Sequence, residues 1–363
     1  MRLSDLEELV CRLVEIESVN PDLVPSGSGE GAIAEYVATW LREIGLEVSV
    51  IAARPGRPSV VGVLRGSGGG RSLMLNAHMD TVGAGGMASP FVPVVRDGRV
   101  YGRGAYDMKA SLAAIMLTAR RARDLKLHGD LIICAVADEE VASIGTSAVL
   151  EQYSADFGIV TEPTELRLCI AHKGFVWLEV ESVGVAAHGS RADLGVDAIA
   201  AMGPVLVGVR LLESRLRAGP RHGLLGTGSL HASLITGGQE MSTYPARCVL
   251  SLERRTVPGE DGASVLREIS PLGGTARITL ERPPSEVAAD HPLSMALASA
   301  AGDPVIIGVA YWMDMALLNT EEIPCVAYGP AGEGAHADVE WVDIASVQKC
   351  IDVYLRVAEL LCN

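Results

Sequence analysis

The sequence has few of the features that mark exported, membrane or nucleic-acid-binding proteins. No apolar run is long enough to cross a bilayer, and the seven cysteines include no C-x-x-C pair. We therefore expect a soluble, cytoplasmic protein with reduced thiols. The net charge of −15 and the aromatic content of 4% leave little basic surface and few stacking platforms, which excludes nucleic acid as a partner.

The chain is long enough for two hydrophobic cores, since one core rarely serves 363 residues. Short β-branched apolar runs alternate with helical stretches, which predicts an α/β fold with a mostly parallel sheet flanked by helices. Residues 174–284 follow the order β-α-β-β-α-β of a small α+β, ferredoxin-like domain. We therefore expect a domain formed by residues 1–173 and 285–363, with the smaller domain inserted into it.

His78 and Asp80 follow an apolar strand predicted over residues 73–76. Side chains two positions apart on an extended backbone point to the same side, so Asp80 is placed to hold His78 and fix its tautomer. A histidine and an aspartate at this spacing are also common as a surface pair. This motif alone therefore leaves both interpretations open.

Other metal-ligating side chains also stand where predicted strands end or helices begin. Each has an ordinary alternative, such as a helix N-cap or an exposed acidic turn. Taken together, two histidines and three carboxylates at such junctions form a ligand set for two zinc ions that share one bridging ligand. Cobalt or manganese would also be accepted. The predicted metal ligands are His78, Asp107, Glu140, Glu162 and His336.

These motifs occur in order along essentially the whole chain and resemble those of the acetylornithine deacetylase, succinyl-diaminopimelate desuccinylase, aminoacylase and carboxypeptidase G superfamily. The resemblance implies a zinc-exopeptidase-like catalytic domain in which Asp107 bridges the two zinc ions. His78 and Glu162 would complete one site, and Glu140 and His336 would complete the other. Glu139 would be the general base.

The resemblance also implies that the inserted domain acts as a lid and as the interface of a homodimer. His188, in the segment Val185–Ser190, would stabilise the oxyanion in the partner subunit's site. Arg255, in the segment Glu253–Glu260, would bind the substrate carboxylate. Ser242 stands where relatives often carry asparagine, which leaves its substrate contact open. Without the resemblance, His188 would be a loop histidine and Arg255 a surface cation.

We therefore predict a two-zinc hydrolase that cleaves the amide bond of a small N-acyl amino acid, with Glu139 activating a zinc-bound water. The alternatives with the same mechanism are a dipeptidase or carboxypeptidase and a succinyl-diaminopimelate desuccinylase-like enzyme. A non-catalytic, ligand-binding relative is disfavoured because the base and all five ligands are present. The acyl group, the physiological metal and lid closure stay open.

Overall fold

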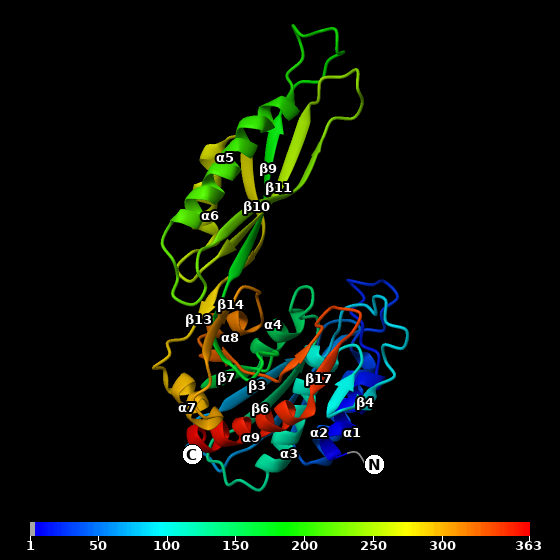
Figure 1. Cartoon of the computed structure of the whole chain (residues 1–363), viewed down its shortest axis with the longest axis vertical. Coiled ribbons are helices and arrows are strands. Elements are labelled where there is room, and N and C mark those ends of the chain that lie inside the picture. Colours follow the sequence, from blue (N-terminus) through cyan, green and yellow to red (C-terminus); the bar gives the residue numbers. More distant parts are fainter. Residues whose placement is uncertain (1–3) are drawn as a thin grey trace. The chain divides into compact units, whose positions relative to one another are not determined.

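The computed structural model describes residues 4–363, which divide into two compact units (Figure 1). Unit 1 comprises residues 4–170, 287–307 and 313–363. Unit 2 comprises residues 171–286 and 308–312. The predicted insertion, residues 174–284, falls within unit 2, and residues 1–3 of the predicted first domain lie outside the described residues.

Most strands of a nine-stranded sheet belong to unit 1; the sheet has the order β1-β2-β6-β3-β7-β15-β8-β13, with β14 paired to β8. Strands β6, β3, β7 and β15 run parallel, and antiparallel strands flank them. Residues of β3 and β6 are all buried, as expected for parallel strands covered on both faces. The strands are β1 Glu47–Arg54, β2 Arg57–Leu64, β3 Leu73–His78, β6 Leu131–Val136, β7 Phe157–Val160, β8 Leu168–His172, β13 Ser285–Glu286, β14 Ile306–Val309 and β15 Cys325–Ala327.

Helices flank this sheet, as the alternating pattern predicted (Figure 1). Helix α1 begins with the capping box formed by Ser4 and Glu7, in which each side chain accepts from the other residue's backbone N–H. The helices are α1 Asp5–Glu15, α2 Gly31–Glu43, α3 Ala110–Ala122, α4 Ile144–Leu150, α7 Pro292–Ala301, α8 Met315–Thr320 and α9 Ile344–Leu361. A small second sheet contains β4 Val94–Arg96, β5 Arg99–Tyr101, β16 Gly332–Glu333 and β17 Trp341–Asp343.

Helix α3 begins at Ala110, directly after a separate irregular turn, η1, formed by Ala105–Lys109. Within η1, Asp107 and Met108 have non-helical backbone angles. The turn therefore presents Asp107 just before the buried helix α3.

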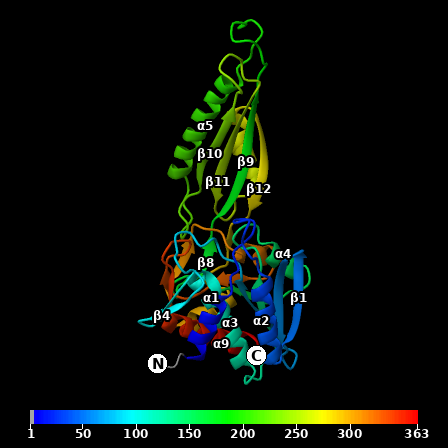
Figure 2. The same ribbon diagram turned by 90° about the vertical axis from the view of Figure 1, so that its right-hand side faces the viewer.

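Unit 2 has the predicted β-α-β-β-α-β order. Its antiparallel sheet runs β10-β11-β9-β12 (Figure 2), and helices α5 and α6 lie on one face of it (Figure 1). Apolar residues that alternate along β9 pack against the inner face of α5. The apolar residues therefore recur with a period of two along the strand and with a helical period along α5. The elements are β9 Gly174–Val183, α5 Ala198–Ala218, β10 Ser229–Gly237, β11 Arg247–Thr256, α6 Gly262–Ile269, the short turn η2 Ser270–Leu272 and β12 Thr275–Arg282.

Within residues 4–363, no helix has the length and apolarity needed to cross a membrane. All seven cysteines are buried free thiols. The cytoplasmic location stays a prediction.

Candidate metal centre

Three neighbouring parallel strands of unit 1 bring acids and a histidine to one edge of the sheet. His78 is the last residue of β3, which lies between β6 and β7. Glu139 and Glu140 follow β6, and Glu162 follows β7. Because parallel strands end at the same edge, side chains far apart in sequence meet there. Asp107 from η1 reaches the same place.

The carboxylate of Asp107 lies between two imidazoles. Its Oδ1 is 3.0 Å from His78 Nε2, and its Oδ2 is 3.5 Å from His336 Nε2. His78 Nε2 also lies 3.6 Å from Glu162 Oε1, and His336 Nε2 lies 3.1 Å from Glu140 Oε2. One oxygen toward each histidine is the arrangement that a ligand bridging two cations requires. The structure thus brings all five predicted ligands together.

Two overlapping groups of these side chains have ligand atoms within 4.8 Å of one another. His78 belongs to both groups, once with Glu139 and Glu162 and once with Asp107 and Glu140. Glu139, predicted as the base, therefore lies within reach of the same ligand atoms. Imidazole and carboxylate in such a cluster are the ligands that zinc prefers in catalytic sites.

The tautomer of His78 is set by the backbone of Asp80. His78 Nδ1 lies 2.9 Å from the main-chain oxygen of Asp80, and a carbonyl only accepts, so Nδ1 carries the proton. Nε2 is then the ring nitrogen that faces Asp107 and Glu162. The carboxylate of Asp80, which we expected to hold the ring, is 3.6 Å from Nδ1. It accepts instead from the backbone N–H groups of Glu139 and Glu140, at 3.1 and 3.2 Å.

The cluster carries more negative charge than its histidines balance. Burial and the neighbouring Glu162 raise the pKa of Glu139 well above its ordinary value, and burial and Asp107 raise the pKa of Glu162 to about 8. Hydrogen bonds with Asp107 and Glu140 raise the pKa of His336 to about 10. For His78, burial opposes the charged form, but the bond with Asp107 and the nearby carboxylates raise its pKa well above the usual value.

Two buried cationic side chains close to Asp107 in the sequence bond to other groups. Lys109 Nζ donates to the main-chain oxygen of Ile16 at 2.6 Å, and Arg103 pairs with Glu340 at 2.7 Å. One buried oxygen of Glu140, Oε1, has no hydrogen-bond partner among residues 4–363. Buried carboxylates without partners are costly unless they coordinate a metal, so the residues present fit a divalent cation.

Glu340 was not identified from the sequence, although it shapes the turn that presents Asp107. Its buried carboxylate accepts from Arg103 Nη1 at 2.7 Å and from the backbone N–H groups of Gly104, Tyr106 and Asp107 at 2.9–3.0 Å. The only signal in the sequence was an acidic residue inside the otherwise apolar run 339–342. Its partners stand more than 230 positions earlier, which local pattern cannot reveal.

The three remaining predicted residues lie in unit 2. His188 forms an isolated bridge with Thr243, and Gly189 N–H donates to the main-chain oxygen of Ser242 at 2.7 Å. His188 and Ser242 therefore lie in neighbouring loops. Arg255 lies near the other end of β11, where its guanidinium pairs with Glu253 at 2.7 Å and stacks 4.9 Å from the centre of the Phe175 ring. The structure does not bring Arg255 together with the other two.

A mostly parallel α/β sheet with a histidine-carboxylate cluster at its carboxyl edge defines a metal-dependent hydrolase. The chain belongs to the peptidase family M20/M25/M40, whose model matches residues 74–360, and this confirms the resemblance seen in the motifs. Its members hydrolyse amide bonds, and the same chemistry holds for this chain.

Two curated relatives match nearly the whole chain. An acetylornithine deacetylase from Vibrio atlanticus (strain LGP32) is 28% identical over 381 residues, covering 100% of both chains. N-formyl-4-amino-5-aminomethyl-2-methylpyrimidine deformylase from Bacillus subtilis (strain 168) is also 28% identical, over 96% of this chain and 93% of that protein.

Among solved structures, a Bacillus subtilis protein described as a dinuclear metal-binding peptidase of the M20 family superposes with a TM-score of 0.70. It is 18% identical and covers 98% of this chain and 97% of its own. At that identity, the match supports the fold of the whole chain.

Proposed function

We propose that the protein is a two-zinc deacylase of small N-acyl amino acids. The observation that carries the proposal is the Asp107 carboxylate, which directs one oxygen to His78 and the other to His336. The two curated relatives are named as a deacetylase and a deformylase, so both remove a small acyl group. Hydrolytic removal of a small acyl group is the simplest function that accounts for both similarities.

In this proposal the five residues would hold two zinc ions: Asp107 would be shared, His78 and Glu162 would serve one ion, and Glu140 and His336 would serve the other. Two such ions lower the pKa of a water molecule and polarise the substrate carbonyl. Cobalt or manganese would suit the same ligands.

Glu139 is the proposed acid–base group. Its backbone N–H is fixed by Asp80, so its carboxylate stands at a defined place beside the ligands. It accepts the proton of the attacking water and then donates it to the leaving amine, so that one carboxylate serves both steps.

Unit 2 supplies the proposed substrate contacts. Arg255 has the planar fork that binds a carboxylate with two parallel hydrogen bonds, and its pairing with Glu253 and stacking on Phe175 keep that fork oriented. His188 is proposed to stabilise the oxyanion in a partner subunit's site. The serine at 242 offers a shorter reach than the asparagine of many relatives, and its contact stays open.

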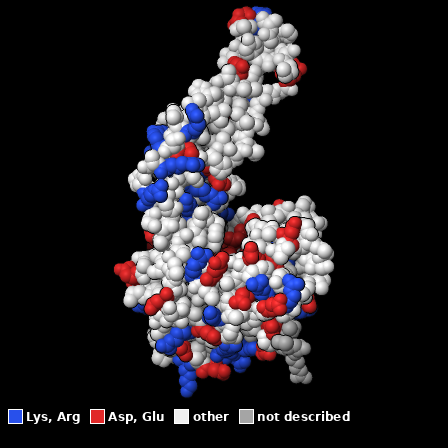
Figure 3. Space-filling view, viewed as in Figure 1, with Lys and Arg blue, Asp and Glu red and all other residues white. Residues whose placement is uncertain are grey.

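We further propose a homodimer formed through unit 2. Strand β10 is an edge of the sheet, so its outer backbone groups are free to pair with another strand. Large apolar side chains on it are exposed, with Leu234 at 68% and Ile235 at 51%. Val207 and Leu211 on the adjacent helix α5 are exposed by 51% and 54%. On the visible face, Lys and Arg gather on the lower part of unit 2, and the upper part has few charged side chains (Figure 3).

The test is hydrolysis of N-formyl, N-acetyl and N-succinyl amino acids and of dipeptides by zinc-loaded protein. A chelator-treated sample, restored with zinc, is the control. Metal-dependent release of one N-acyl class supports the proposal and identifies the acyl group. A preference for dipeptides would replace the deacylase with a dipeptidase that uses the same site. Two bound metals without hydrolysis of any substrate would refute the catalytic proposal.

A further inference from the structure

The turn that carries Glu139 and Glu140 is held by one buried carboxylate. Asp80 Oδ1 accepts from Glu139 N–H and Asp80 Oδ2 accepts from Glu140 N–H, and Asp80 has no exposed surface. The position of both acids therefore depends on where the Asp80 carboxylate is directed. Whatever orients Asp80 also orients the proposed base and a proposed ligand.

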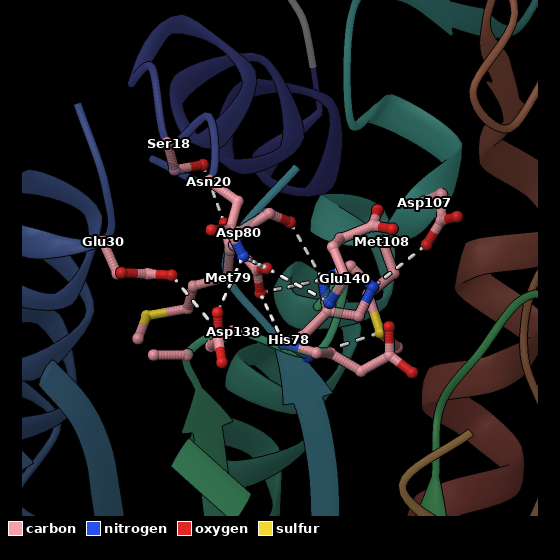
Figure 4. Close-up of polar contacts among 12 residues, drawn as sticks. Ser18, Asn20, Glu30, His78, Met79, Asp80, Asp107, Met108, Asp138 and Glu140 are labelled. Carbon is pink, nitrogen blue, oxygen red and sulfur yellow. Dashed lines mark hydrogen bonds and ion pairs between the residues drawn. The ribbon is translucent and has the colours of Figure 1, made fainter. Parts of the chain in front are cut away.

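Asn20 orients Asp80 by standing between two buried carboxylates. Its side-chain nitrogen, Nδ2, donates to Asp80 Oδ2 at 2.8 Å and to Asp138 Oδ1 at 3.0 Å (Figure 4). These two bonds use both hydrogens of the amide. Its oxygen, Oδ1, accepts from the backbone N–H of Asp22 at 3.0 Å, which fixes which way the amide faces. The reverse orientation would put an oxygen against two carboxylates.

The backbone of Asn20 is also fixed against the end of β3. Val19 forms a parallel bridge with Thr81, Asn20 N–H donates to the Thr81 oxygen at 2.9 Å, and Ser18 Oγ donates to the Met79 oxygen at 2.7 Å. The side chain is fully buried. Asn20 is thus delivered to the two carboxylates from a rigid segment rather than from a mobile loop.

A buried ion network supports Asp138 from the other side. Arg57 Nη2 donates to Asp138 Oδ1 at 2.8 Å, and the same guanidinium binds Glu30 through two bonds of 2.6 and 2.7 Å. Glu30 Oε1 in turn accepts from Asp138 N–H at 3.2 Å. Arg57 donates to one oxygen of Asp138, Oδ1, and within residues 4–363 it forms no hydrogen bond to Asp80, so the Asn20 amide links this network to the metal centre.

We propose that Asn20 is a positioning residue for the metal centre, acting through Asp80 on Glu139 and Glu140. The inference rests on the proposed two-zinc function. Two carboxylates at the ends of neighbouring strands repel each other and only accept hydrogen bonds, so a neutral side chain with two donors suits the place between them. The amide keeps Asp80 directed so that its oxygens still meet both backbone N–H groups of the acidic turn.

The discriminating substitution is Asn20→Asp, which keeps the shape of the side chain and replaces both donors with an acceptor. We expect the zinc affinity and kcat each to fall about 10- to 100-fold, the range for residues that orient metal ligands, with KM changed less than threefold. The visible absorption spectrum of the cobalt-loaded protein should shift, because the geometry of a ligand changes. Zinc affinity is measured by competition with a chromophoric chelator.

Asn319→Leu is the matched control. Asn319 is a partly buried asparagine of unit 1 that bonds to Met315 and Cys325, at the amino end of β15 rather than at the carboxyl edge of the sheet. The Asn319→Leu substitution should lower the temperature of unfolding and leave the zinc affinity and the cobalt spectrum unchanged. A loss shared equally by both variants would show a general effect of folding and overturn the inference.

Asn20→Ser keeps one hydrogen-bond donor and is the substitution to test if the Asn20→Asp protein does not fold. Its zinc affinity should fall by less than that of Asn20→Asp, and a value within twofold of the native protein would overturn the inference. Failure of the proposed zinc site gives a different result, because the native protein itself would then bind no zinc in the competition assay. If the native protein binds zinc without hydrolysing any substrate, the affinity and the cobalt spectrum still decide the role of Asn20.

Discussion

The protonation of His172 should make the protein less stable in mild acid. The ring is fully buried at the end of β8, its Nδ1 donates to the Lys173 oxygen at 3.0 Å, and its edge meets the ring of Trp312. Among residues 4–363, Nε2 has no hydrogen-bond partner. A proton there would create a buried charge without a partner, so burial lowers the pKa of His172 to about 4.

The sign and size of the effect follow from proton linkage. A histidine whose folded pKa lies below its unfolded pKa of about 6.5 binds fewer protons in the folded state. Its contribution to stability is therefore complete above pH 6.5 and is lost as the pH falls toward 4. Between pH 7.5 and pH 5, the free energy of unfolding should fall by about 2 kcal/mol because of this one group.

The measurement is urea unfolding, followed by tryptophan fluorescence, at both pH values. His172→Phe keeps an aromatic ring against Trp312 but cannot take up a proton, so it should lose about 2 kcal/mol less than the native protein over the same interval. His231→Phe, which changes an exposed histidine on β10, should behave like the native protein. If the native protein and His172→Phe lose the same free energy, the buried ring is not the source of the pH dependence.

Four further results are expected. Glu139→Ala should slow turnover by at least about a hundredfold while the zinc content, measured by mass spectrometry, stays near that of the native protein; normal turnover would remove Glu139 from the mechanism. Mixing Glu139→Ala with His188→Ala should restore part of the activity through hybrid dimers, and no recovery after subunit exchange would argue against a shared site. Glu340→Gln should lower the free energy of unfolding by about 3 kcal/mol in urea, because Arg103 is left as a buried charge without its partner. Leu234→Asp should yield monomers in light scattering if β10 forms the interface, whereas an unchanged mass would place the interface elsewhere.

The sequence predicted that these histidines and carboxylates lie together because strand ends can be recognised locally. A buried apolar run followed by a histidine or an acid marks the carboxyl edge of a parallel sheet, and the geometry of such sheets brings those ends together. His78 and Glu162 were found in this way, although 84 positions separate them. The β-α-β-β-α-β order of unit 2 could be predicted for the same reason, since a change of apolar period is visible within each segment.

The supporting residues could not be predicted because their partners are distant and their own surroundings carry no pattern. The sequence around Asn20 indicates only a turn before a proline. In the structure its side chain joins the carboxylates of Asp80 and Asp138, which lie 60 and 118 positions away. Asp80 was expected to hold His78 through its carboxylate, but the chain turns so that the carbonyl makes the contact and the carboxylate serves the acidic turn. The spacing of two residues on a strand fixes the side to which each side chain points. It does not determine whether the carbonyl or the carboxylate oxygen of Asp80 contacts the histidine.

The division of unit 1 into separate stretches of chain has a consequence for how the protein is made. The first four predicted ligands are synthesised before unit 2, whereas His336 follows Glu162 by 174 residues. At the usual pace of translation, the last ligand emerges roughly 10 to 35 s after the fourth. Strand β15, which completes the sheet between β7 and β8, also arrives only then. Zinc offered to a nascent chain halted before residue 325 would meet an incomplete set of ligands on an unfinished sheet.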